Sequence, residues 1–287
     1  MRFKVFNFWL ILFFTASCSK VQNNGPLPIF IEIEEFRLNP IAQVDDSKIK
    51  GAWCFIEDEF VGYYPLPNVL PIFSQQPVNI SLLPGIYANG IAATPEDYPF
   101  YHAYEFEVDP LSNTPSTIIP ETKYKDNTKF SLIEDFENGQ TYFTKSLNES
   151  AIDHFMIQQG VVFEGEYAGK IELDQENNNS IEIATSKRWS STSLGKNDVY
   201  LEVQYQTEVP IVFGLVGFTS LEEENGFPLY QFGVNPSENW NKIYIKLDEL
   251  LLDSSIQAYS ICFSANLEGY GLSRANIYLD NIKLIHF

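Results

Sequence analysis

The apolar residues of this chain come in short, alternating runs, and this pattern limits the possible folds more than any other feature. In the first run Ile29, Ile31 and Ile33 alternate with residues that include two glutamates. This is the period of a strand with one buried face. The chain has 23 Phe and 16 Tyr, which favour strands, and 16 Pro and 16 Gly, which favour tight turns. The sequence therefore predicts an all-β protein.

Residues 27–128 suit a small immunoglobulin-like sandwich. After the first run, the pattern predicts strands at the following ranges: 49–56, 60–63, 78–83, 101–108 and 117–124. A turn is expected at Pro84-Gly85. The hairpin around the acidic turn Glu57-Asp58-Glu59 resembles that of PEGA-like surface domains. We expect the aromatic cluster at 98–101 to be packed loop residues, or alternatively a docking edge.

A polar stretch at residues 124–129 marks the expected boundary, and residues 129–287 form a second β-rich region. Within it, strands are expected at the following ranges: 166–173, 181–184, 199–205, 211–218, 229–234, 242–247, 256–263 and 275–285. Their spacing suits a jelly roll, so the predicted fold is an immunoglobulin-like sandwich followed by a jelly-roll sandwich. One helical turn is expected at 248–252.

Three motifs of the second region are similar to those of galactose-binding-like jelly rolls, the fold of many carbohydrate-binding modules. They are Asp-Phe-Glu-Asn-Gly at 135–139, Asn-Trp-Asn-Lys-Ile-Tyr-Ile at 239–245 and Leu-Asp-Asn-Ile at 279–282. This resemblance implies that the first and last strands lie close together. It also implies a structural calcium held by Glu134 or Glu137 together with Asp280, since calcium prefers oxygen ligands. The alternative is that these carboxylates cap strand ends.

Glycan binding in such modules depends on exposed aromatic rings that stack on sugars. The candidates here are Trp189, Tyr230, Trp240 and Tyr270. Trp240 begins an alternating strand, which favours core packing. Trp189 lies between basic residues and serines, a setting typical of an exposed loop.

No enzyme signature is present. The three histidines are His102, His154 and His286, and they do not form a His-Glu-x-x-His motif; no Gly-x-Ser-x-Gly motif or phosphate loop occurs. Two carboxylates could in principle hydrolyse a glycoside, but acidic pairs are common in a chain of this composition. We therefore predict a non-catalytic protein, with glycoside hydrolase as the remote alternative.

The start of the chain has the form of a secretory signal. Arg2 and Lys4 precede an apolar run of about ten residues, roughly 15 Å as a helix and too short for a bilayer core of about 30 Å. The following Thr-Ala-Ser-Cys resembles a bacterial lipobox, which implies cleavage after residue 17 and diacylglyceryl and palmitate chains on Cys18. Residues 18–26 then form a lipidated tether. The alternative is a secreted protein without lipid.

Two other cysteines, Cys54 and Cys262, lie within apolar runs and are predicted to be buried free thiols, with a disulfide between them as the alternative. The chain has 18 Lys and Arg against 38 Asp and Glu, a net charge of −20. This charge excludes nucleic acid and anionic lipid headgroups as favourable partners. Attachment to a membrane must therefore come from the acyl chains on Cys18.

The whole chain resembles two-domain outer-membrane lipoproteins of Bacteroidota. Two functions remain open. In the preferred one the chain is a lipid-anchored scaffold or accessory subunit of an envelope protein complex at the outer membrane, on its periplasmic or its surface face. In the other, the jelly roll captures a polysaccharide.

Overall fold

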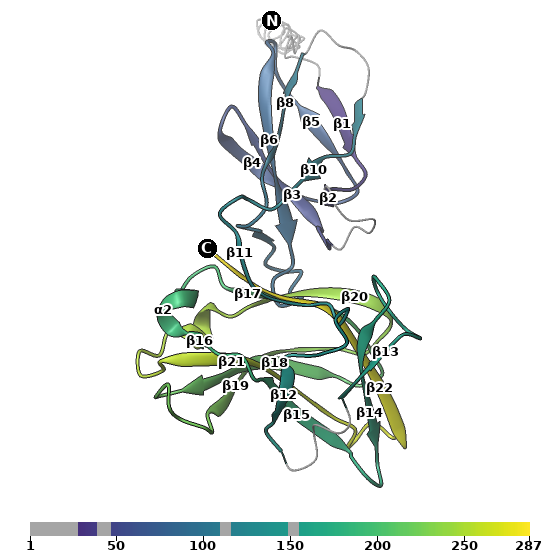
Figure 1. Cartoon of the computed structure of the whole chain (residues 1–287). Coiled ribbons are helices and arrows are strands. Elements are labelled where there is room, and N and C mark those ends of the chain that lie inside the picture. The colour runs from purple at the N-terminus through teal and green to yellow at the C-terminus, as the bar shows by residue number, and fades with distance from the viewer. Residues whose placement is uncertain (1–27, 39–46, 110–115, 149–154) are drawn as a thin grey trace, which may run out of the picture.

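The computed structural model describes residues 28–38, 47–109, 116–148 and 155–287. The chain is all-β, as predicted, and its strands build two sandwiches (Figure 1). The predicted signal and the lipidated Cys18 lie outside the described residues. In the described part, no helix has the length and apolar character needed to cross a membrane.

The first sandwich contains strands β1 (Ile29–Ile33), β2 (Arg37–Leu38), β3 (Gly51–Ile56), β4 (Glu59–Pro65), β5 (Asn68–Ile72), β6 (Val78–Ile86), β7 (Glu96–Asp97), β8 (Tyr104–Val108), β9 (Ser116–Ile118) and β10 (Glu121–Thr122). One sheet has the order β5-β1-β9, and β10 pairs with β2. The other sheet has the order β4-β3-β6, with β7 and β8 both paired to β6.

The alternation in β1 is confirmed, because Ile31 and Ile33 are buried between the two sheets while Phe30 is exposed. The turn predicted at Pro84-Gly85 is wrong. Both residues continue β6, where Pro84 lies opposite Ala52 of β3. A strand tolerates Gly85 here because the Tyr63 ring covers its backbone; an added Cβ would lie 2.6 Å from that ring.

The second sandwich contains strands β11 (Lys129–Glu134), β12 (Phe143–Ser146), β13 (Phe155–Gln158), β14 (Ala168–Asp174), β15 (Ser180–Thr185), β16 (Trp189–Ser190), β17 (Tyr200–Thr207), β18 (Ile211–Phe218), β19 (Phe227–Val234), β20 (Ser237–Lys246), β21 (Ala258–Asn266) and β22 (Arg274–His286). Its short helices are α2 (Ser191–Leu194) and the 3-10 turn η2 (Asp248–Leu251). The helical turn expected at 248–252 is therefore present.

Two six-stranded sheets face each other in the second sandwich. One has the order β13-β14-β22-β17-β20, with β11 also paired to β22. The other has the order β12-β15-β21-β18-β19, with β16 also paired to β21. The chain crosses repeatedly between the sheets, as in a jelly roll. The first and last strands, β11 and β22, pair antiparallel, as the resemblance implied.

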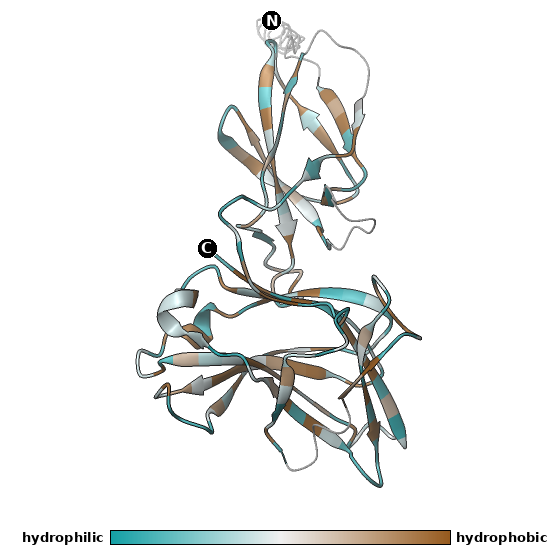
Figure 2. Ribbon diagram, viewed as in Figure 1, coloured by the Kyte–Doolittle hydropathy of each residue, from teal (hydrophilic) through white to brown (hydrophobic). Residues whose placement is uncertain are grey.

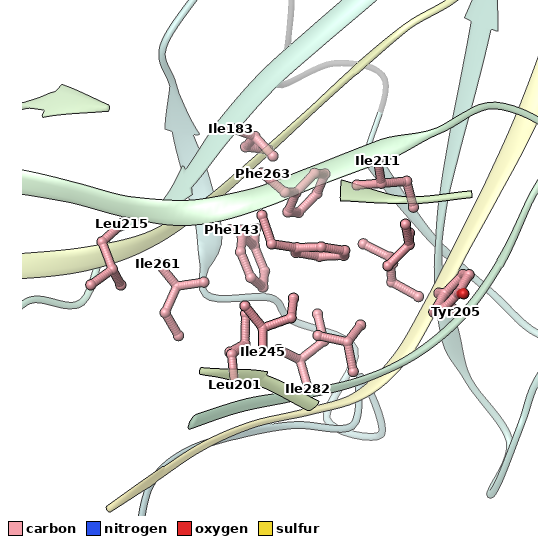
Figure 3. Close-up of a cluster of buried hydrophobic side chains, with 14 of the residues drawn as sticks. Phe143, Ile183, Leu201, Tyr205, Ile211, Leu215, Ile245, Ile261, Phe263 and Ile282 are labelled. Carbon is pink, nitrogen blue, oxygen red and sulfur yellow. The ribbon is translucent and has the colours of Figure 1, made fainter. Parts of the chain in front are cut away.

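Side chains from both sheets fill the space between them. Phe143, Ile183 and Phe263 come from one sheet and meet Leu201 and Ile245 of the other (Figure 3). In Figure 2 many of the paired strands alternate between hydrophobic and hydrophilic bands. This period of two residues is what places one face of each strand in the core.

The two sandwiches meet through a buried aromatic cluster. Tyr98 of the first sandwich lies edge-on to Tyr200 of β17 and Tyr244 of β20, with ring centroids 5.2 and 4.9 Å apart. Phe100 and Tyr101 are also buried here. The cluster at 98–101 is thus packed, against the outer face of the β17-β20 sheet, on which the first sandwich stands in Figure 1.

A buried ion pair lies beside this cluster. Lys242 Nζ is 2.6 Å from a carboxylate oxygen of Glu202, and both side chains are almost fully buried. The hydroxyl groups of Tyr98 and Tyr124 donate hydrogen bonds to the same carboxylate, at 2.6 and 3.0 Å. Residues of the first sandwich and of the segment after it therefore satisfy a charge that belongs to the second.

The prediction for the cysteines is confirmed. Cys54 and Cys262 are both buried and free, so no disulfide joins the two sandwiches. Burial raises the pKa of both thiols, to about 11 for Cys54. Both are therefore unreactive thiols at neutral pH.

Candidate functional site

A groove crosses the outer face of the β12-β15-β21-β18-β19 sheet, on the side away from the first sandwich. Residues 144–147 form one wall, and the segment 224–228, which leads into β19, forms the other. Its volume is about 870 Å³, within the range of about 300–1,000 Å³ typical of small-molecule sites. We call this feature the groove.

The floor of the groove follows from strand alternation in β21. Tyr259, Ile261 and Phe263 point into the core, which turns Ser260 and Cys262 toward the outer face. The neighbouring strands add small or apolar side chains at the same level, among them Ala184 and Val216. Because these floor residues are short, the face is hollow rather than flat.

Ser260 places a polar group at the bottom of the groove. The residue is only 1% exposed, and it lines the floor. Its hydroxyl can donate a hydrogen bond to, or accept one from, a ligand group that reaches the floor.

Arg188 is held at one end of the groove. Its guanidinium lies 3.6 Å from the ring centre of Phe218 and donates hydrogen bonds to the backbone carbonyls of Glu223 and Glu224, at 2.5 and 3.1 Å. Stacking and two carbonyl contacts fix the plane of the guanidinium. Its remaining N–H groups stay available to a ligand, since a guanidinium has five.

Tyr230 of β19 lies beside the groove, opposite Gly214 of β18. Burial is the main cause that raises the pKa of its phenol, and the nearby Cys262 and Glu182 raise it further, while the Ser264 hydroxyl lowers it. The phenol is therefore protonated at neutral pH, and it hydrogen-bonds with the side chains of Ser264 and Glu182. Glu182, from β15, also lines the groove.

The charged side chains that line the groove balance. They are Lys145 and Arg188 against Glu182 and Glu224, in a chain whose net charge is −20. Hydroxyl groups supply most of the other polar atoms, from residues that include Thr144 and Ser260. Such a surface offers donors and acceptors at short intervals without a net charge of its own, which suits an uncharged ligand rich in hydroxyl groups.

The four aromatic residues predicted for glycan binding do not share one site. Tyr230 alone lies beside the groove. Tyr270 is 50% exposed in the turn between β21 and β22, and the half-buried Trp240 packs edge-on against Phe163, with ring centroids 5.9 Å apart. Exposure of Trp189 is a wrong prediction. It is 7% exposed, because β16 pairs with β21 and carries the ring into the core.

Sequence reasoning missed Ser260, Arg188 and Glu182. The alternation Ser260-Ile261-Cys262-Phe263-Ser264 does show that small polar residues occupy one face of a strand. It does not show that the neighbouring strands also present short side chains on that face. The hollow depends on which strands become neighbours, and this is a property of the sheet.

The three carboxylates proposed for calcium are held separately by backbone N–H groups. Glu134 accepts from Tyr142 at 2.6 Å, Glu137 from Glu166 and Tyr167, and Asp280 from Phe163 at 3.0 Å. No group of three or more His, Cys, Asp or Glu residues able to hold a metal occurs among the described residues. The structural calcium stays a prediction from the resemblance.

Asp280 is fully buried. Burial raises the pKa of this carboxyl to about 7, although backbone N–H groups of Glu164, Phe163 and Asn281 lower it. Burial also raises the pKa of Glu134. These groups anchor the segment around residue 163 to β22 and the segment around residue 142 to β11.

No protein-family model matches the chain, and no curated protein matches it. Several solved structures do resemble the chain. One is from work on carbohydrate-binding modules of the β-sandwich superfamily, at 13% identity and a TM-score of 0.39, covering 92% of this chain and 99% of that one. Another is the family 11 carbohydrate-binding module of a cellulosomal cellulase of Clostridium thermocellum. Its sequence identity is 14% and its TM-score is 0.38, and the match covers 56% of this chain and 95% of that one.

A third is the C-terminal family 22 module of Xyn10B from the same organism, at 12% identity and a TM-score of 0.37, covering 54% of this chain and 91% of that one. The TM-scores are low, so the function is argued from the groove itself. All three of these structures are of carbohydrate-binding modules.

Proposed function

We propose that the chain is a glycan-binding protein and that the groove holds a neutral polysaccharide segment. The observation that carries this proposal is the groove itself, a hollow of about 870 Å³ with Ser260 at its floor, lined by balanced charges and further hydroxyl groups. Sugar hydroxyl groups both donate and accept hydrogen bonds, so they can satisfy Ser260, Arg188 and Glu182 together.

This proposal reverses the order of preference drawn from the sequence, where the scaffold role came first. The groove offers polar contacts to a glycan, with Tyr230 as the aromatic side chain beside it. We propose no catalytic step, because the groove needs none to bind a glycan. The lipid anchor at Cys18 and an outer-membrane location remain part of the proposal.

Affinity electrophoresis of the mature chain against soluble polysaccharides tests the groove. The panel contains neutral glucan, galactan, mannan and xylan, with polygalacturonate as the charged member. We expect retardation by at least one neutral polymer. Ser260→Ala and Arg188→Met should each weaken it about tenfold, because each removes a hydrogen-bonding group worth roughly 1–3 kcal/mol in a desolvated site.

Lys196→Met is the matched control for Arg188→Met, since Lys196 is an exposed cation outside the groove. It should leave retardation unchanged, and the melting temperatures of all variants are measured alongside. Two results contradict the proposal: no retardation by any polysaccharide, or retardation that Ser260→Ala and Arg188→Met leave intact in folded protein.

A further inference from the structure

An exposed apolar patch lies on the outer face of the β5-β1-β9 sheet of the first sandwich. Phe30, Val69 and Phe73 are 47%, 46% and 66% exposed, and Pro71 is half-buried. Strand register brings them together: Phe30 lies directly opposite Pro71, and Phe73 follows directly after β5, two positions beyond Pro71. We call these four residues the end patch.

The end patch lies at the end of the first sandwich that is farthest from the second (Figure 1). Residues 73–77 connect β5 to β6, and β6 then runs toward the second sandwich, where Ala88 pairs with Tyr244 of β20. The strand β1 begins at the same far end, since Ile29 lies opposite Ile72, the last residue of β5. The chain therefore enters the described structure beside the end patch.

The segment that supplies most of the end patch carries no charge. No Asp, Glu, Lys or Arg occurs between residues 60 and 95, in a chain of which 20% is charged. The connection at 73–77 reads Phe-Ser-Gln-Gln-Pro. Taking residues 69–77 out of water therefore requires no charge to lose its hydration. Glu32 of β1, opposite Val69, limits the patch on the side toward the second sandwich.

The other sheet makes the same end of the sandwich acidic on its opposite side. The Glu57 carboxylate accepts a hydrogen bond from the backbone N–H of Asn79 near the start of β6, and Glu107 of β8 lies opposite Asn79. Both carboxylates are exposed. An anionic surface would be repelled by them, whereas a zwitterionic or uncharged surface can contact the apolar side.

We propose that the end patch rests on the zwitterionic or uncharged lipid surface of the membrane and fixes the orientation of the chain, an inference that rests on the proposed lipid anchor at Cys18. Pro28 follows Cys18 by ten positions, a stretch that spans at most about 36 Å when fully extended. The end of the sandwich that carries the patch is therefore held close to the acyl chains. The anchor supplies the attachment, and the end patch adds a contact at high effective concentration.

A membrane fits the end patch better than a second protein does. A stable protein interface buries about 800 Å² of each partner and involves about 20–30 residues a side. Four side chains at the end of a short sheet fall well below that size. A tethered contact with lipid needs less area, because the acyl chains already hold the chain at the surface. For the same reason the end patch alone is too small to retain a chain that lacks acyl chains.

The test places an environment-sensitive dye beside the end patch of the lipidated full chain. Gln75→Cys supplies the attachment point, since Gln75 is exposed in the connection after Phe73. The thiols of Cys54 and Cys262 are buried and should take no label, which the unchanged protein checks. After reconstitution in phosphatidylcholine vesicles, we expect the dye emission to shift to the blue and doxyl-labelled lipid to quench it, because the dye touches an apolar environment.

Phe73→Ser in the Gln75→Cys background should abolish both the blue shift and the quenching. Phe60→Ser is the matched control, because Phe60 is a 56% exposed phenylalanine of the same sandwich that lies on the other sheet. It should leave both signals unchanged, and melting temperatures verify that every variant is folded. An unshifted dye in the Gln75→Cys protein, or a blue shift that survives Phe73→Ser, would overturn the proposal.

Flotation of the vesicles measures the anchor separately. A chain that floats with the vesicles but shows no blue shift has its anchor and lacks the proposed contact. A chain that does not float lacks the anchor, and the proposed contact fails with it. A blue shift that appears without vesicles and grows with protein concentration would show that a second copy of the chain covers the end patch, which would also overturn the proposal.

Discussion

At the scale of single residues, the most demanding feature is the Glu202-Lys242 pair. The two side chains are 0% and 3% exposed, and a charge in such a place is tolerated only when it is paired and hydrogen-bonded. Nothing in the sequence around Glu202 distinguishes it from the chain's many exposed carboxylates. Its partners Tyr98 and Tyr124 lie 104 and 78 positions away.

We expect Glu202→Gln or Lys242→Met to lower the free energy of unfolding by about 3 kcal/mol, because each leaves one buried charge without its counter-ion. The double variant should lose less free energy of unfolding than the two single variants together. Urea unfolding measures the stability of all three variants. Glu172→Gln is the control, since its pair with Lys170 is partly exposed and should be worth at most about 1 kcal/mol. Strict additivity in the double variant would contradict the coupling.

At the scale of elements, the β3-β4 hairpin was correctly expected around its acidic turn. This turn contains no glycine, and its backbone geometry shows the cost. Glu57 and Asp58 both adopt positive φ, 49° and 65°, the conformation of a two-residue hairpin turn that normally uses Asn-Gly or Asp-Gly. The Glu57 carboxylate accepts a hydrogen bond from the backbone N–H of Asn79 at 2.6 Å, which helps to hold the turn in this conformation.

Asp58→Gly should therefore raise the free energy of unfolding by about 1 kcal/mol, because glycine adopts a left-handed conformation without the steric penalty of a side chain. Thermal and urea unfolding measure this gain. Glu59→Gly is the control: Glu59 lies in β4 with ordinary strand geometry, so glycine there should destabilise. A loss of stability in Asp58→Gly would show that the aspartate makes a compensating contact.

At the scale of the whole molecule, the position of the groove relative to the start of the chain decides which way the groove would face if that start were attached to a membrane. Leu38, after β1, joins the cluster between the sandwiches, so the chain enters the first sandwich at its far end (Figure 1). The groove lies on the sheet of the second sandwich that faces away from the first. A chain anchored at Cys18 would thus present the groove away from the membrane.

The proposed lipid anchor at Cys18 is tested by Cys18→Ala in the full chain expressed in its own host. We expect this variant to leave the membrane fraction while the unchanged protein stays in it, because the strong negative charge gives the described sandwiches no attraction to anionic lipid. Immunoblots of separated fractions measure the outcome. Retention of the variant in the membrane would show that a protein contact, rather than acyl chains, holds the chain there.

The sequence by itself determined the all-β class, many of the strands and which of their faces are buried. Isoleucines alternate in β1, and β18 spans the residues expected for it, because a strand's two-residue period is a local property of the backbone. The tertiary structure decided the burial of Trp189, the Glu202-Lys242 pair and the groove around Ser260. Each depends on strands distant in sequence becoming neighbours, which no local pattern records.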